Sequence, residues 1–397
     1  MRRAAKSFPT RTPRSKRASP NPWTPAAAGV HAVPPAHMTT ARLDASAVRA
    51  RRAVATVFFL NGAVLASWIP HIPAVKAAHA LGDGALGLVL LAMAAGAIVA
   101  MPIAGVLIGR LGSRSMTTAT AVGLAITVPV PLVAPSVPLL AAALFMLGAL
   151  NGALDVSMNV QALAVEARYR RPIMSSFHAL FSLGGLVGAA GAALVMTSTV
   201  GDRAHLLLTS AVASATLAFV VRRLVTTPPA ASVERPLALP GRGLVALGGL
   251  AFLGLLAEGA MADWSAVYLR DSLRTTAAVA ALGFGAFSLA MTAGRFAGDR
   301  MVARFGPVRV LRASSALAAA GLAVALLIGS APIALIGFGT VGFGIANVIP
   351  VLFSGAANVR GAGTGSALAA VATTGYFGFL AGPAVIGFTA ELTSLPI

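Results

Sequence analysis

Gly105-Val-Leu-Ile-Gly-Arg-Leu-Gly-Ser-Arg114 is a short basic turn between two long apolar stretches, and it is the first anchor of an internal repeat. A second basic turn, Asp299-Arg-Met-Val-Ala-Arg-Phe-Gly-Pro-Val-Arg309, lies in a similar setting. Arg110 and Arg304 are 194 positions apart. The same spacing relates Gly184 to Gly378 and Gly188 to Gly382, and Trp68 and Trp264 are 196 apart. Several anchors at nearly one spacing indicate a duplicated unit.

The composition is that of a membrane protein. Hydrophobic residues make up 57% of the chain, charged residues 10%, and the mean hydropathy is +0.85. A soluble domain carries about 25% charged residues. The chain has no cysteine, which excludes disulfides, thiolate nucleophiles and cysteine-based metal sites. No other spacing predicts a metal site, a cofactor site or an enzyme.

The first 52 residues are strongly basic. They hold eleven of the 30 Lys and Arg residues, many Pro and Ala, and one acid, Asp44. No helical or strand periodicity is visible, so we expect a disordered tail beside an anionic membrane surface. We do not expect nucleic-acid binding, because aromatic stacking partners are nearly absent from the tail.

Apolar runs of membrane-spanning length recur after the tail. A run of about 20 residues crosses a bilayer core of about 30 Å as a helix. We predict an all-α membrane protein with a tail at 1–52, a six-helix unit at 53–221, a linker at 222–242 and a five-helix unit at 243–397. The predicted spans are 53–75, 84–108, 116–133, 137–162, 173–198, 204–221, 243–268, 275–297, 308–328, 333–356 and 364–389.

The basic residues predict the orientation. If the N-terminus is inside and the helices alternate, 26 of the 30 Lys and Arg residues fall on the inside. Arg295 is counted there, with the turn that follows it. Cytoplasmic loops carry such an excess. We therefore expect a multi-pass protein of a bacterial inner membrane with a cytoplasmic N-terminus.

The repeat also predicts a helix that the sequence does not contain. Shifted by 194, the sixth span would reappear at 398–415, beyond Ile397. Two interpretations remain open. The chain is a truncated copy of a twelve-helix protein, which we favour, or it has eleven spans.

These features resemble the major facilitator superfamily, and more narrowly its fucose-permease-like branch. The residues that carry the branch resemblance are Ala66-Ser-Trp68, Ala257-Glu-Gly259 with Asp263-Trp264, His178-Ala-Leu-Phe-Ser-Leu-Gly184, and Val371-Ala-Thr-Thr-Gly-Tyr376 with Gly382-Pro383. The resemblance implies two parallel six-helix repeats and a binding site near the bilayer midplane. One departure is Gly109, where the superfamily usually has an Asp that helps to hold the cytoplasmic side closed.

Three acids lie within apolar runs. An intramembrane charge is costly, so Asp155, Glu258 and Asp263 are candidates for function. Asn151, Asp155 and Asn159 share one helix face. The branch resemblance implies proton coupling at Asp155. Glu258 and His178 are further candidates for proton coupling, while structural carboxylates and a packing histidine are the alternatives.

Further polar and aromatic residues are candidates for the substrate cavity, although membrane-interface anchoring explains the tryptophans equally well. With Asp263 these candidates are Asn61, Trp68, Asn151, Asn159, Trp264, Asn347 and Tyr376. The candidates for cytoplasmic gating are Gly105, Arg110, Gly112, Arg114, Asp299, Arg300, Arg304 and Gly306.

The sequence thus predicts a monomeric secondary active transporter that moves a small solute across the lipid bilayer by alternating access. Proton coupling is the sharper hypothesis, and the branch resemblance implies a sugar-like or other polar metabolite as the substrate. The direction, uptake or efflux, stays open. The alternative is a truncated membrane protein that transports nothing.

Overall fold

The computed structural model describes residues 45–196, 201–226, 241–359 and 363–392, and these residues are almost entirely helical. The tail to residue 44 and most of the predicted linker lie outside the described residues. The first part of the chain holds α1 (Ala45–Trp68), η1 (Ile69–His71), α2 (Ile72–Ala78), α3 (Asp83–Leu111), α4 (Ser113–Thr127), η2 (Val130–Val133), α5 (Val137–Tyr169), α6 (Met174–Met196), α7 (Asp202–Val220) and η3 (Val221–Arg223).

The second part begins after the undescribed segment 227–240. It holds α8 (Arg242–Val267), η4 (Tyr268–Ser272), α9 (Ala277–Phe305), α10 (Pro307–Ile328), α11 (Ala331–Ile345), α12 (Val348–Ala356) and α13 (Thr364–Leu392). Eight helical stretches in the described residues have the length and hydropathy of a membrane span. Three further helices, α6, α9 and α13, are not among these eight stretches and are 23, 29 and 29 residues long. The predicted all-α membrane fold is confirmed.

Two boundaries differ from the sequence prediction. Helix α1 begins at Ala45, so residues 45–52 of the predicted tail are helical. The extension is stabilised beyond the bilayer core, because the Arg51 guanidinium lies 5.3 Å from the centre of the Tyr169 ring. The run at 333–356 is divided between α11 and α12, with Ala346 and Asn347 at the joint.

The duplication is visible in the backbone. Gly112 and Gly306 separate consecutive helices with nearly identical dihedral angles, φ 78° and ψ 152° or 156°. Residues other than glycine rarely adopt such a positive φ. Both turns therefore require glycine, at positions 194 apart.

Close helix contacts repeat at the same spacing or within one residue of it. A Cβ atom at Gly148 of α5 would collide with the carbonyl of Met93 in α3, and one at Gly342 of α11 with that of Phe287 in α9. Likewise Gly184 faces Phe59 of α1, and Gly378 faces Phe252 of α8. Small residues allow helix backbones to approach in this way. The pairs α3–α5 and α1–α6 thus correspond to α9–α11 and α8–α13.

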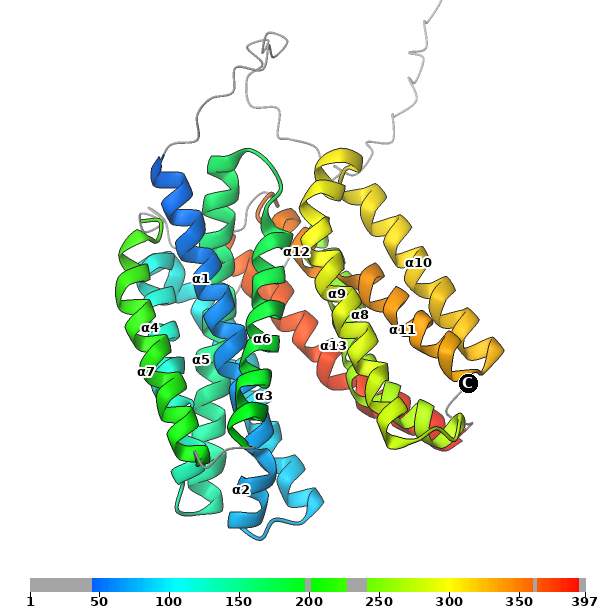
Figure 1. Ribbon diagram of the computed structural model, residues 1–397. Coiled ribbons are helices and arrows are strands. Elements are labelled where there is room, and N and C mark those ends of the chain that lie inside the picture. The colour runs from blue at the N-terminus through cyan, green and yellow to red at the C-terminus, as the bar shows by residue number, and fades with distance from the viewer. Residues whose placement is uncertain (1–44, 197–200, 227–240, 360–362, 393–397) are drawn as a thin grey trace, which may run out of the picture.

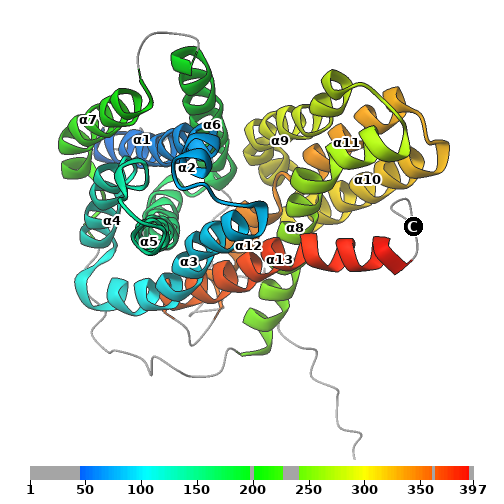
Figure 2. The ribbon, with the colours of Figure 1, turned by 90° about the horizontal axis from the view of Figure 1, so that it is seen from below.

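The helices form two bundles that lie side by side, α1–α7 and α8–α13 (Figures 1 and 2). Between them α3 packs against α13, and α6 packs against α9. We call the end that holds the Gly112 and Gly306 turns the basic end. The bundles lie closest at this end and diverge towards the other (Figure 1).

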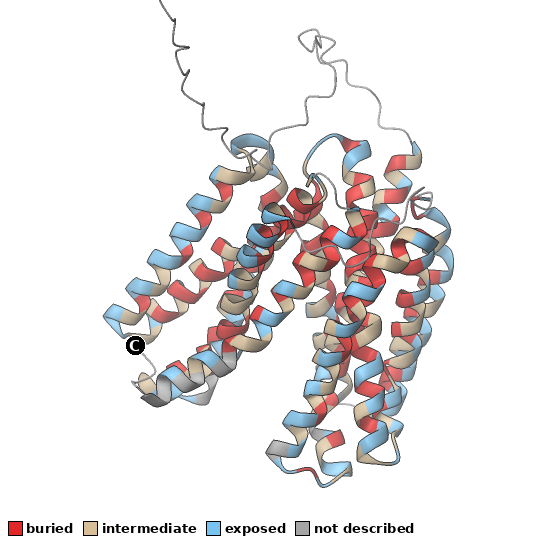
Figure 3. Cartoon of the chain, turned by 180° about the vertical axis from the view of Figure 1, so that it is seen from behind, coloured by how far each residue is buried: buried red, intermediate tan, exposed pale blue. Residues whose placement is uncertain are grey.

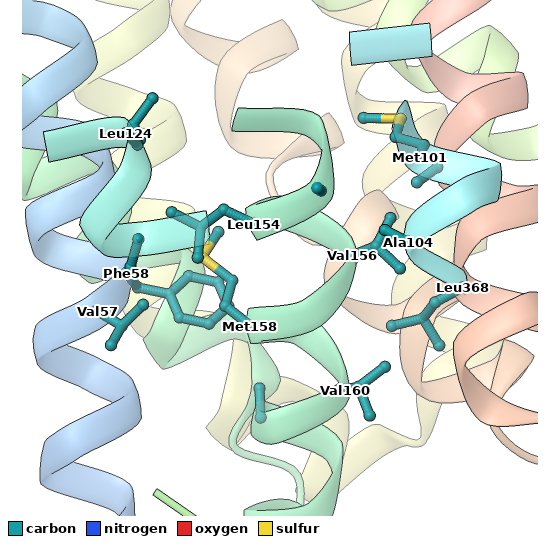
Figure 4. Packing of buried hydrophobic residues seen from close by; sticks show 14 of the residues in the cluster. Val57, Phe58, Met101, Ala104, Leu124, Leu154, Val156, Met158, Val160 and Leu368 are labelled. Atoms are coloured by element: carbon teal, nitrogen blue, oxygen red, sulfur yellow. The ribbon is translucent and has the colours of Figure 1, made fainter. Parts of the chain in front are cut away.

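Helix α5 packs against helices of both bundles. Leu154 and Met158 face α1 and α4 of the same bundle, whereas Val156 and Val160 face α3 and Leu368 of α13 (Figure 4). Buried residues gather on the inward faces of the helices and exposed residues on the outer faces (Figure 3). Exposed Leu88, Leu289 and Leu327 illustrate an apolar periphery suited to lipid.

Candidate functional site

A set of polar side chains lies where the two bundles meet, and we call it the central cluster. It consists of Asp155 and Asn159 of α5, His178 and Ser182 of α6, Glu258 of α8, Arg295 of α9 and Tyr376 of α13. Except for His178, these residues lie about 12 to 24 Å from the basic ends of their helices, at 1.5 Å per residue. This depth is near the middle of a bilayer core.

The first bundle contributes a chain of hydrogen bonds. The Asn159 amide nitrogen donates to the Asp155 carboxylate at 3.2 Å and to the Asp155 carbonyl at 2.8 Å. The Asn159 amide oxygen lies 3.1 Å from His178 Nε2, which acts as donor in this pair. The structure therefore brings together the predicted residues Asp155, Asn159 and His178. Asp155 retains accessible surface, whereas Asn159 is fully buried.

The second bundle contributes a cation that the sequence analysis assigned to a cytoplasmic turn. Arg295 lies inside α9, ten residues before its end at Phe305, and is only 8% exposed. Its placement among the turn residues is therefore wrong. Its guanidinium donates to the Ser182 hydroxyl across the bundle interface at 2.6 Å. Its distance to the Glu258 carboxylate is 3.8 Å.

The break between α11 and α12 helps to hold Arg295. Pro350 has no backbone N–H, so the Ala346 carbonyl loses its helical donor. Arg295 Nε points at that carbonyl, at 3.5 Å. The neighbouring Asn347 is buried, and its amide donates to the Gly294 carbonyl at 3.1 Å. Asn347 thus fixes the helix break against α9 beside the central cluster.

Tyr376 links the two sides of the central cluster. It lies beside Asn151 and within the electrostatic field of both Asp155 and Glu258. Asp155, Glu258 and Tyr376 all keep partial exposure although their helices are surrounded by others. Among the residues that the structure describes, no Lys or Arg pairs with Asp155. The cluster can therefore offer hydrogen-bond donors, acceptors and charge of both signs to a small polar molecule.

A second set of contacts joins the bundles at the basic end. The Asp299 carboxylate accepts from the backbone N–H of Ser176, in the first turn of α6, at 3.2 and 3.3 Å. Glu166 of α5 accepts from the N–H groups of Ile173 and Met174 at 2.8 and 2.9 Å, and from the Ser354 hydroxyl of α12 at 2.8 Å. Carboxylates at a helix N-terminus are stabilised by its partial positive charge. We call Glu166, Ser176, Asp299 and Ser354 the latch.

The basic turns lie beside this latch. Gly105 packs against Gly365 and Ala369 of α13, where a Cβ atom would lie 2.8 Å from the Ala369 side chain. Arg114 donates to the Arg222 carbonyl and to the Thr226 hydroxyl. Arg110, Arg300 and Arg304 are exposed. At Gly109, the position that departs from the family pattern, a Cβ atom would meet no described atom within 4 Å.

Other predicted residues lie apart from the central cluster. Asn61 lines a small apolar cavity inside the first bundle, with Leu124, Leu154 and Leu217 among its neighbours. Trp68 is buried at 2% exposure, whereas its repeat counterpart Trp264 is half-buried. Asp263 is exposed near the end of α8.

Sequence reasoning missed Arg295, Ser182 and Glu166. Ser182 had a usable signal, because Tyr376 lies 194 positions further on. Arg295 also had one, since it is separated from the Asp299 turn by Phe-Ala-Gly and follows an apolar run. No local pattern points to Glu166, whose partners are Ile173, Met174 at the start of α6 and Ser354 of α12.

The family model of the Major Facilitator Superfamily matches residues 54–383. The chain belongs to this superfamily. An uncharacterised superfamily transporter of Yersinia pestis is 38% identical over 341 residues, covering 86% of this chain and 88% of the relative. The membrane protein MosC of Rhizobium meliloti is 37% identical over 348 residues, covering 86% and 84%.

Solved structures of the superfamily share the fold. The transporter FucP in its outward conformation superimposes with a TM-score of 0.70 at 18% identity, covering 88% of this chain and 94% of FucP. The human organic anion transporter MFSD10 gives a TM-score of 0.72 at 17% identity, covering 88% and 95%. At these identities the match concerns the fold alone. The sequence match to the superfamily nevertheless shows that this chain is a transporter and not an enzyme.

Proposed function

We propose that this chain is a secondary active transporter that binds a small polar solute at the central cluster and couples its movement to protons. The observation that carries the proposal is the meeting of Asp155, Glu258 and Arg295 at mid-depth between two apolar bundles, with His178 joined to Asp155 through Asn159. Buried charge of this kind is costly in a membrane protein, and it is retained mainly along substrate and ion pathways.

The contacts at the basic end support alternating access. The latch and the α3–α13 contact at Gly105 hold the bundles together there, while the helices diverge at the other end (Figure 1). We assign the basic end to the cytoplasm, because basic residues are enriched in cytoplasmic loops. The conformation is then closed to the cytoplasm, and transport requires the latch to open.

Asp155 is the proposed proton carrier. It is the cluster's acid without a basic partner among the described residues, and it keeps accessible surface. A carboxyl group in this setting can be neutral or ionised according to the side to which the cluster is open. Its hydrogen bond to Asn159 connects it to His178, which lies on the helix whose first turn joins the latch.

The test is transport by the purified protein in proteoliposomes. A panel of polar metabolites is assayed with and without a pH gradient, in uptake and in counterflow. The wild type is expected to accumulate at least one solute in response to the gradient. Asp155→Asn is expected to abolish accumulation and retain counterflow, while the exposed Asp263→Asn serves as the matched control. An unchanged gradient dependence in Asp155→Asn would remove Asp155 from the proposal, and a complete absence of solute exchange would favour a non-transporting membrane protein.

A further inference from the structure

Arg295 has more donors than the described residues satisfy. A guanidinium carries five N–H groups in a rigid planar fork. Its short contact is to the Ser182 hydroxyl, at 2.6 Å. The Ala346 carbonyl is at the 3.5 Å limit of a hydrogen bond, and the Glu258 carboxylate, at 3.8 Å, lies beyond it.

The burial of Arg295 makes this deficit significant. The residue is 8% exposed and lies inside a membrane helix, where water does not replace missing acceptors freely. Surface arginines satisfy their donors with solvent, but this side chain lies between Ser182 of α6, Glu258 of α8 and the Ala346 carbonyl at the end of α11. A buried cation is stable when it is paired and hydrogen-bonded. The described residues offer it only a loose pairing with a partly exposed acid.

We propose that Arg295 binds the carboxylate of the transported solute, so that the substrates are small hydroxylated carboxylates such as sugar acids; this rests on the proposed transport function. A carboxylate matches the guanidinium fork with two parallel hydrogen bonds. Glu258 supplies the carboxylate that lies beside Arg295 until a solute binds. The solute displaces it from Arg295.

Other members of the central cluster and the neighbouring Asn151 define the rest of the substrate. Tyr376, His178 and Asn151 offer hydrogen-bonding groups suited to hydroxyls. In its ionised form Asp155 repels a second anion, so the charged end of the solute lies at Arg295 and its hydroxylated end towards α5. A neutral sugar fills only the second half of this arrangement. A dicarboxylate would meet Asp155, which favours monocarboxylates.

The experiment compares acids with their neutral parents. Purified full-length protein is assayed by thermal shift and by counterflow with galacturonate against galactose, glucuronate against glucose, and gluconate against sorbitol. At least one acid is expected to bind tenfold or more tightly than its parent. A neutral parent that binds as well as its acid overturns this inference and leaves the transport function standing. Absence of binding and exchange for all three acids, with exchange of another polar metabolite, also overturns this inference and leaves the transport function standing, whereas absence of exchange for every polar metabolite overturns both.

Variants separate recognition from structure. Arg295→Gln is expected to lose acid binding, and Arg295→Lys to weaken it about tenfold, because an ammonium lacks the fork. Glu258→Gln is expected to tighten acid binding several-fold, an effect that a purely structural ion pair would not produce. Arg312→Gln, an exposed arginine of α10, is the matched control. Unchanged acid affinity in Arg295→Lys and Glu258→Gln would contradict the assignment even if Arg295→Gln failed to fold.

Discussion

Helices α3 and α9 are repeats of each other, yet they place different chemistry at the same point. Arg295 of α9 corresponds to Met101 of α3 at the spacing of 194. Both side chains are buried, Met101 with no exposed surface and Arg295 with 8%. Met101 packs in an apolar core with Ala104 (Figure 4), while Arg295 reaches Ser182 and Glu258. The duplication preserved the scaffold, and divergence at single positions produced the polar site.

The backbone contacts show what was preserved. Gly148 and Gly342 meet Met93 and Phe287, and all four positions follow the spacing of 194. Ser182 and Tyr376 also correspond, but one binds Arg295 and the other faces Asn151. The comparison therefore predicts that changes at shared contacts harm both bundles alike, whereas changes at divergent positions affect one bundle or one step.

The largest effect is expected at the shared glycines. Gly148→Ala and Gly342→Ala should each destabilise the protein by about 3 kcal/mol, because the added carbon collides with a helix backbone that cannot move away. Size-exclusion profiles in detergent should show loss of the monodisperse species in both variants. Gly249→Ala and Gly285→Ala, which have open space around the new carbon, are the controls. Damage in only one of the two variants would contradict the equivalence of the repeats.

The two matching tryptophans should differ. Trp68→Ala removes a side chain that is 2% exposed, at a cost of about 3–5 kcal/mol. Trp264 is half-buried, so Trp264→Ala should lower the melting temperature less. Thermal unfolding of the two variants measures the difference. Equal shifts would indicate that Trp264 packs as tightly as Trp68.

The latch should control the bundle interface at the basic end. Because the chain has no cysteine, Ser175→Cys provides a unique reporter beside α9. Asp299→Asn and Glu166→Gln should each raise its maleimide labelling rate about tenfold, since a hydrogen bond to a charged group contributes about 1.5 kcal/mol. Labelling that stays at the background rate in both variants would mean that other contacts close this end.

The smallest effect is expected from restoring the family residue at the first basic turn. Gly109→Asp introduces a side chain into open space and should change stability by less than about 0.5 kcal/mol. Transport and Ser175→Cys labelling should remain at the level of the parent protein. A slower labelling rate would show that this turn also closes the basic end and that its contribution is recoverable.

Periodic features of the sequence predicted the fold well. Apolar runs of bilayer length specified the spans, and each of the eleven predicted spans overlaps a helix of the described residues. The spacing of 194 located both glycine turns. Boundaries were less predictable, because α1 continues past the bilayer as far as Ala45 and Pro350 divides a continuous apolar run. The three arginines of residues 45–52 exclude that segment from an apolar run although it is helical, and Pro350 leaves the run at 333–356 apolar although it divides the helix.

The site was predictable only where residues share one helix. Asn151, Asp155 and Asn159 lie four residues apart, so their common face followed from helix geometry. Contacts between helices could not be obtained in this way, because Ser182 and Arg295 are 113 positions apart and Glu166 and Ser354 are 188 apart. Arg295 was misplaced because proximity to a basic turn in sequence was equated with proximity in space. Proton coupling and solute binding at these residues stay predictions.

The joint between α11 and α12 gives the two bundles unequal stiffness. The corresponding positions in α5, Gly152 and Ala153, lie within an uninterrupted helix of 33 residues. The first bundle therefore has one continuous helix where the second has two shorter helices that meet at Ala346 and Asn347. Arg295 contacts the end of α11 through its Nε, which points at the Ala346 carbonyl. We therefore expect a displacement of α12 at the latch to bend the chain at this joint and to shift the Ala346 carbonyl relative to the Arg295 guanidinium. A displacement of α5 is expected to move Asp155 together with the whole helix.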